Sequence, residues 1–348
     1  MIKRKKIYIE ALRILAIFLV LFQHVPAFDY YLQDTSHVMG HLFVTLIAKI
    51  NVPLFLMISG SLLLNREEGY REIFRKRMIK IILAILIFNF LVYLAENQFV
   101  FDLQDYCLGV FENGIDRSYW YLYSYLGFLV MMPLLHRIAQ KMTKNDFILI
   151  LFIHFVFSTI EPLLQWFVPT YLGQSFEFTW AFRIPFSTIK EIFYPLMGYY
   201  IDRKIHIESI HKKTLAGLGC LSLLGILISM FFTIWIGNQE GFSDEYLELF
   251  DYVSALSAFI LIKSFFVHYE AVIPAWISQK IVLLGSVTYG VYLWDPFFRK
   301  LFFDGFDQSM IPWVGGFFSS VLWCICSFLV CGILVQFLKR IPKVKSLF

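Results

Sequence analysis

The sequence predicts an all-α protein that crosses a membrane about ten times. Hydrophobic residues make up 59% of the 348 residues and charged residues only 16%, whereas about a quarter of the residues in a soluble domain are charged. The apolar residues also fall into ten long runs, each of about 20 residues, the length a helix needs to cross a hydrocarbon core about 30 Å thick. We expect one membrane domain over residues 1–348.

Each expected span is an apolar run bounded by aromatic residues or cations, which mark the membrane–water boundary. Residues 97–117 are expected to form a loop. The ten spans are residues 7–28, 40–64, 79–96, 118–137, 146–167, 183–201, 214–236, 250–267, 281–300 and 312–337.

The orientation follows from the cations in alternate loops. The N-terminus and the segments 65–80, 137–144, 203–213 and 339–345 hold twenty-one Lys and Arg residues, and the opposite set holds four. Cytoplasmic loops are the ones enriched in Lys and Arg. We therefore expect both termini in the cytoplasm. We also expect the plasma membrane of a bacterium as the location.

The first span carries Arg13 and His24 in a stretch, 11–28, that is mostly Leu, Ile, Phe and Val. At about 100° per residue, eleven positions bring the second side chain to within about 20° of the first, about 16 Å along the axis. A guanidinium facing lipid costs several kcal/mol, so this face should line a protein interior or a watery cavity. The competing interpretation is an arginine that extends to the interface and a histidine buried in the core.

Five patterns along the chain are distinctive. Arg13 and His24 form an arginine followed after ten residues by a histidine. Four longer segments follow: NVPLFLMISGSLLL (51–64), YWYLYSYLGFLVMMPLL (119–135), FYPLMGYYI (193–201) and LGSVTYGVYLWDPFF (284–298). Each pattern, and their order, resembles the acyltransferase-3 family of integral membrane O-acyltransferases.

Two positions depart from the family pattern. Family members commonly carry two arginines three residues apart where the second inner loop meets the third span, and this chain has Arg77 and Lys80. A histidine near the end of the fourth segment is replaced by Asp295. Lysine keeps the charge but not the bidentate geometry of arginine, and the aspartate supplies a carboxylate where an imidazole is usual. No appended soluble domain is expected.

The resemblance implies transfer of an acyl group, most simply acetyl, from cytoplasmic acetyl-CoA to a hydroxyl of a cell-surface glycan or its lipid-linked precursor. His24 would be the general base or would carry the acyl group. Asp295 or Glu161 would orient it, although a structural ion pair with Arg183, Lys190 or Lys49 also explains a carboxylate there. Arg13 would position the thioester.

Two further groups complete the expected site. A cluster of cations would bind the phosphates of CoA, although the usual enrichment of Lys and Arg in cytoplasmic loops explains it too: Arg75, Lys76, Arg77 and Lys80. An aromatic group could stack on a sugar, although anchoring at the interface explains it too: Trp120, Tyr121 and Tyr123. We expect no metal and no nucleic acid. The expected partners are membrane lipid, the acceptor, and a second copy or glycan-assembly proteins.

Two other functions use the same features. A transporter or exporter of a polar solute could use the polar path through the spans, and a scaffold subunit without activity is compatible with aspartate at position 295. The enzyme is favoured because the basic cluster continues into the polar face and no inverted repeat of the transporter kind is recognisable.

Overall fold

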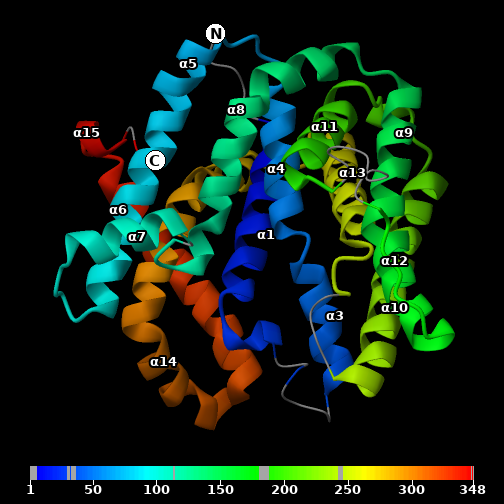
Figure 1. The fold of residues 1–348 in the computed structure, drawn as a ribbon. Coiled ribbons are helices and arrows are strands. Elements are labelled where there is room, and N and C mark those ends of the chain that lie inside the picture. The colour runs from blue at the N-terminus through cyan, green and yellow to red at the C-terminus, as the bar shows by residue number, and fades with distance from the viewer. Residues whose placement is uncertain are drawn as a thin grey trace. The chain divides into compact units, whose positions relative to one another are not determined.

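The computed structural model describes residues 6–29, 32, 37–112, 114–179, 188–241, 246–345 and 347. These residues are helical with connecting turns and no strand, which confirms the all-α class. The predicted Arg183 and most of the N-terminal cations lie outside the described residues. Contacts divide the chain into two compact units, each made of segments that are distant in sequence. Figure 1 shows their helices along the chain.

The first unit comprises residues 1–30, 68–131 and 272–348. Its elements are α1 (Ile7–Gln23), η1 (Pro26–Asp29), α5 (Tyr70–Ile73), η2 (Phe74–Met78), α6 (Ile79–Glu96), α7 (Leu103–Glu112), η3 (Arg117–Tyr119), the first part of α8 (Trp120–Lys141), α14 (Ala275–Leu338) and α15 (Pro342–Lys345).

The second unit comprises residues 31–67 and 132–271. Its elements are α3 (Val38–Ala48), α4 (Asn51–Leu63), the rest of α8, α9 (Lys144–Phe155), η4 (Val156–Ile160), α10 (Glu161–Leu172), α11 (Lys190–Arg203), η5 (Ile207–Ser209), α12 (Lys212–Glu240) and α13 (Asp251–Tyr269).

Among the residues that the structure describes, seven stretches of helix are long and apolar enough to cross a membrane. Of the other expected spans, α1 has 17 residues and α11 has 14. The 64-residue α14 contains both of the last two expected spans as two helical arms, which meet at Gly315, where the backbone is not helical and φ is 78°. Positive φ is accessible to glycine because it has no Cβ. The count of ten spans and the orientation therefore remain predictions.

In the first unit, α1 packs along α14. Phe18 of α1 stacks on Phe328 with ring centroids 4.7 Å apart. The two arms of α14 pack on each other, with Phe303 and Trp323 in edge contact at 5.3 Å, as Figure 1 shows at the bottom of the orange and red segment. The arms therefore form a helical hairpin against the first helix.

The end of α1 differs from the expected span. The helix stops at Gln23, His24 is its C-cap, and a short 3₁₀ turn follows from Pro26. Proline lacks an N–H and disfavours a helical conformation in the residue before it. His24 thus lies at a helix end rather than within a helix.

The expected loop at 97–117 contains a helix, α7, which corrects the prediction. Its buried residues are Tyr106 and Val110, four positions apart on one face, and the Tyr106 hydroxyl donates to the carbonyl of Leu86 at 2.6 Å. Side chains four apart share a helix face. Only that narrow face is packed, and the helix has just 10 residues, too few to cross a membrane and so without the signal of a span.

In the second unit, α4 and α11 pack with their backbones in close approach. A Cβ at Gly60 would overlap the backbone of Pro195, and a Cβ at Gly198 would overlap that of Met57. Small residues allow such approach between membrane helices. The Lys263 ammonium of α13 donates to the carbonyls of Ile201 and Asp202 near the end of α11, at 2.9 and 3.0 Å.

Candidate active site

His24, at the end of α1, contacts the carboxylate of Asp295 on the first arm of α14. His24 Nδ1 lies 3.1 Å from Asp295 Oδ2, and the two side chains are 12% and 1% exposed. A proton on Nδ1 is donated to the carboxylate, which leaves the lone pair of Nε2 available. A carboxylate so placed orients the imidazole and stabilises it when it becomes an imidazolium.

Asp295 is itself held by two further side chains. Ser327, on the second arm of α14, donates from Oγ to Asp295 Oδ1 at 2.6 Å. Arg299 Nε lies 3.9 Å from Oδ2. The buried carboxylate is therefore paired and hydrogen-bonded, as a charge in a low-dielectric interior requires.

Arg299 extends the polar group to the segment before α8. Its guanidinium lies 3.2 Å from Asp116 Oδ2 and donates to Ser118 Oγ at 2.9 Å. Burial alone would raise the pKa of Asp116, but the positive charge of Arg299 and the hydrogen bonds from Ser118 outweigh it and hold the pKa below its ordinary value. Asp116 is thus a stable carboxylate that anchors Arg299 beside Asp295.

Two tyrosines join the start of α8 to the helix that bears Asp295. Tyr119 donates from its hydroxyl to the carbonyl of Leu293 at 2.8 Å, and Tyr292 donates to the carbonyl of Ser118 at 2.6 Å. Both tyrosines are buried. These reciprocal bonds hold the start of α8 against the part of α14 just before Asp295, and so help to position the dyad of His24 and Asp295.

The three predicted aromatic residues lie in different positions around these two hydrogen bonds. Trp120 is 45% exposed. Tyr121 meets the ring of Tyr292 edge-on at 6.1 Å, and Tyr123 donates to the carbonyl of Val110 in α7 at 2.9 Å. Tyr121 is therefore the one in direct contact with the residues that fix the dyad, and the sugar-stacking role of all three remains a prediction.

Arg13 forms an ion pair within its own helix. Its guanidinium lies 3.1 Å from Oε1 and 3.2 Å from Oε2 of Glu10, one turn earlier. Glu10 is buried, and it packs so tightly against α14 that a Cβ at Gly285 would overlap it. Arg13 is thus positioned through Glu10, about 16 Å from His24 along the axis.

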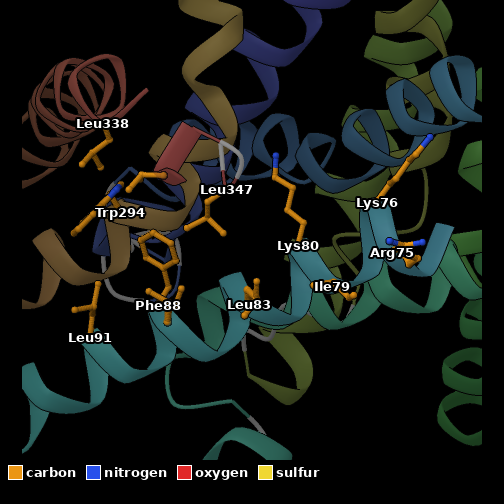
Figure 2. A pocket seen from close by; sticks show the side chains of 12 residues that line it. Arg75, Lys76, Ile79, Lys80, Leu83, Phe88, Leu91, Trp294, Leu338 and Leu347 are labelled. Atoms are coloured by element: carbon orange, nitrogen blue, oxygen red, sulfur yellow. The ribbon is translucent and has the colours of Figure 1, made fainter. Parts of the chain in front are cut away.

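Three of the predicted cations line a groove of about 560 Å³ beside α6. Figure 2 shows Arg75 and Lys76 at one end and the apolar side chains further along. Lys80 Nζ lies 5.7 Å from the centroid of the Tyr289 ring. The rest of the lining is apolar or aromatic: Ile79, Leu83, Ile87, Phe88, Leu91, Trp294, Leu338, Val344 and Leu347.

The fourth predicted cation is engaged elsewhere. Arg77 donates from Nε and a terminal nitrogen to the two carboxylate oxygens of Glu68, at 2.7 and 2.6 Å. It is not among the residues that line this groove. The π-helical turn η2 (Phe74–Met78) contains Arg75, Lys76 and Arg77, and such turns widen the helix and shift the direction of successive side chains.

Glu161 lies in the second unit, whereas His24 and Asp295 lie in the first. It is buried as the first residue of α10 and accepts from Gln165 at 3.4 Å. The lysines named as its possible partners, Lys49 and Lys190, both bond Glu248. Of the two candidate carboxylates, Asp295 is the one that contacts His24.

Sequence reasoning missed four residues of this site. Arg299 follows Asp295 by four positions and Glu10 precedes Arg13 by three, so helical spacing could have paired them. Ser327 and Asp116 reach the site from distant segments, and no local pattern marks them.

The fold and the site together define an integral-membrane protein with a buried histidine–carboxylate pair suited to proton transfer. The chain matches the acyltransferase-3 family, described as an acyltransferase domain, over residues 6–335. Because this match covers nearly the whole chain, the protein belongs to that family and is a membrane acyltransferase. No curated protein and no solved structure matches it.

Proposed function

We propose that this protein moves an acetyl group from cytoplasmic acetyl-CoA to a hydroxyl of a cell-surface glycan or its lipid-linked precursor. The observation that carries the proposal is the contact between His24 Nδ1 and Asp295 Oδ2 at 3.1 Å. It provides a buried base that a carboxylate orients. Family membership supports acyl transfer as the reaction.

The groove beside α6 supports CoA as the donor. Lys80, Arg75 and Lys76 supply positive charge for phosphates at one end. The other end is apolar and reaches Trp294, the residue before Asp295. From Lys80 to Leu91 the helix rises about 16 Å. A donor whose phosphates bind the cations would thus extend along the groove toward the helix that bears the dyad.

In the reaction, the acceptor oxygen forms a bond to the thioester carbonyl carbon and the carbon–sulfur bond breaks. His24 Nε2 takes the hydroxyl proton and passes it to the departing thiolate, so that CoA leaves as a thiol. Asp295 stabilises the intermediate imidazolium. Alternatively Nε2 attacks the thioester carbonyl carbon and the carbon–sulfur bond breaks, so that CoA leaves as a thiolate. The acetyl group then passes from Nε2 to the acceptor oxygen, and the hydroxyl proton goes by way of the imidazole to the thiolate. Either route uses the same free nitrogen.

The test measures transfer and donor binding separately. Replacing His24 with Ala should abolish glycan O-acetylation, measured by mass analysis of surface glycans, and leave acetyl-CoA affinity, measured by calorimetry, nearly intact. Loss of a general base lowers the rate by about 10²–10⁴. The exposed His206 provides a matched control, since His206→Ala should change neither. Full acetylation by a folded His24→Ala variant would refute the assignment.

A second pair of variants tests the donor side. Arg75→Ala with Lys80→Ala should weaken acetyl-CoA binding, whereas the same change at Arg66 and Arg71, which are not among the groove-lining residues, should not. Arg13→Ala should lose both binding and transfer. Equal effects of the two pairs would exclude the groove as the donor site.

A further inference from the structure

A second group of charged side chains lies in the second unit and takes no part in the site above. The carboxylate of Glu248 is shared by two ammonium groups, with Lys49 Nζ at 3.5 Å from Oε1 and Lys190 Nζ at 2.5 Å from Oε2. Lys49 caps α3 and Lys190 begins α11. Glu248 lies in the non-helical segment 246–250.

This segment lies among the membrane helices rather than beyond their ends. Lys49 is near the middle of the apolar stretch Val38–Leu63. On either side of Glu248, Leu247 packs with Leu42 and Leu46 of α3, and Leu249 packs in a second apolar cluster. Irregular backbone at membrane depth occurs only where protein buries it or where it lines a water-filled cavity.

The exposure of the charged groups indicates water. The side chains of Glu248 and Lys190 are 43% and 33% exposed. Lipid cannot cover a carboxylate and an ammonium at this depth without a cost of several kcal/mol. The exposed side of the pair therefore faces water rather than lipid, so a polar ligand can reach the two lysines.

The surroundings favour an anion at this point. Besides the two ammonium groups, the N-termini of α11 and α13 lie here, and neither N-cap, Ile189 or Phe250, makes a side-chain capping bond. Helix N-termini carry partial positive charge on unpaired N–H groups. Asp251 and Glu191 are opposing charges. Asp251 is buried and accepts from the Tyr194 hydroxyl at 3.1 Å, and Glu191 lies in the first turn of α11.

We propose that Lys49 and Lys190 bind an oxyanion, a carboxylate or phosphate, of a ligand, and that Glu248 occupies this position in its absence. Glu248 can leave because its segment is not part of a helix and its side chain is partly exposed. Resting on the proposed function, the ligand would be the acceptor, so the glycan would carry an acidic sugar or a phosphate.

The test uses the purified full chain in detergent and calorimetric titration with glucuronate and with glycerol 1-phosphate. Glucose and glycerol serve as uncharged counterparts. Glu248→Gln removes the carboxylate that competes with the ligand for the two lysines. The apparent affinity is proportional to the fraction of protein in which the lysines are open to the ligand. If Glu248 occupies the lysines about 90% of the time, the variant should bind the oxyanion about tenfold more tightly. The exposed Glu208 provides the matched control, Glu208→Gln, which should bind as the wild type does.

The role of the two lysines in binding is tested by adding a second substitution to Glu248→Gln. Adding Lys190→Gln to Glu248→Gln should remove the gained binding, and a melting curve in the same detergent shows whether the double variant is folded. If this double variant is unfolded, Lys49→Gln replaces Lys190→Gln as the second substitution and should also remove the gained binding. A preference for glucuronate identifies a carboxylate, and a preference for glycerol 1-phosphate identifies a phosphate.

Two results would overturn the inference: unchanged oxyanion binding in Glu248→Gln, or equal binding of the uncharged compounds. A purely structural ion pair predicts the first of these, with a lower melting temperature. Because binding is measured without turnover, a negative result here leaves the role of His24 intact. Conversely, oxyanion binding together with full acetylation by His24→Ala would reject the proposed function and keep this site.

Discussion

Replacing Asp295 with Asn tests the central contact of the site with little change of shape. The amide keeps the size of the carboxylate but removes its charge, and it can present an N–H to His24 Nδ1. Ser327 can still donate to the remaining oxygen, so the packing of the two arms of α14 is preserved. The expected defect is electrostatic, because the imidazolium that forms during proton transfer loses its counter-charge.

The distance sets the size of the effect. At 3.1 Å and an effective dielectric constant of about 20, the attraction between the imidazolium and the carboxylate is about 5 kcal/mol. Arg299 shares the carboxylate at 3.9 Å, which reduces the part that His24 receives. Since 1.36 kcal/mol is a factor of ten in rate, the full attraction is worth nearly four orders of magnitude. We expect a loss of about 10²–10⁴, comparable to the same substitution in a serine-protease triad.

The assay is release of free CoA thiol and glycan acetylation by protein in vesicles. Asp304→Asn, at an exposed position on the same arm of α14, is the matched control and should retain activity. Acetyl-CoA affinity should be unchanged in both variants. If Asp295→Asn transfers acetyl groups at the normal rate while His24→Ala is inactive, Asp295 does not orient the base and the reasoning from the contact fails.

Three further predictions concern packing, orientation and pH. Gly198→Ala should destabilise the protein by about 1–3 kcal/mol through overpacking, seen as a lower melting temperature, whereas Gly217→Ala, with no atom within 4 Å of the new Cβ, should not. In a cysteine-free background, Gln104→Cys should react with an impermeant thiol reagent in whole cells and His211→Cys should not; the reverse would invert the predicted orientation. Burial works to raise the pKa of Asp116, but its ion pair and hydrogen bonds hold it below 3.8, so its stabilisation is complete above that pH and is lost as the pH falls through the folded pKa. The melting temperature should therefore fall more steeply below about pH 4 in the wild type than in Asp116→Asn, and parallel curves would contradict this.

The sequence alone predicted the class of protein, the family and several helix bounds. The third expected span, 79–96, coincides with α6, because a run of apolar residues behind a basic turn is a local signal. The two polar residues of the first span were placed on one face by helical periodicity. Asp295 is predicted as a partner of His24 from its position toward the outer half of its span, and Glu161 is a second candidate for which a structural ion pair is the slightly favoured explanation.

Only the tertiary structure decided between these carboxylates. His24 and Asp295 are 271 residues apart in the chain, and no local pattern encodes which distant helix end will meet α1. The same holds for Ser327, which reaches Asp295 because α14 reverses at Gly315. Hydrophobicity and helical period act over a few turns and set which segments are helices, whereas the pairing of buried charges depends on how those helices pack.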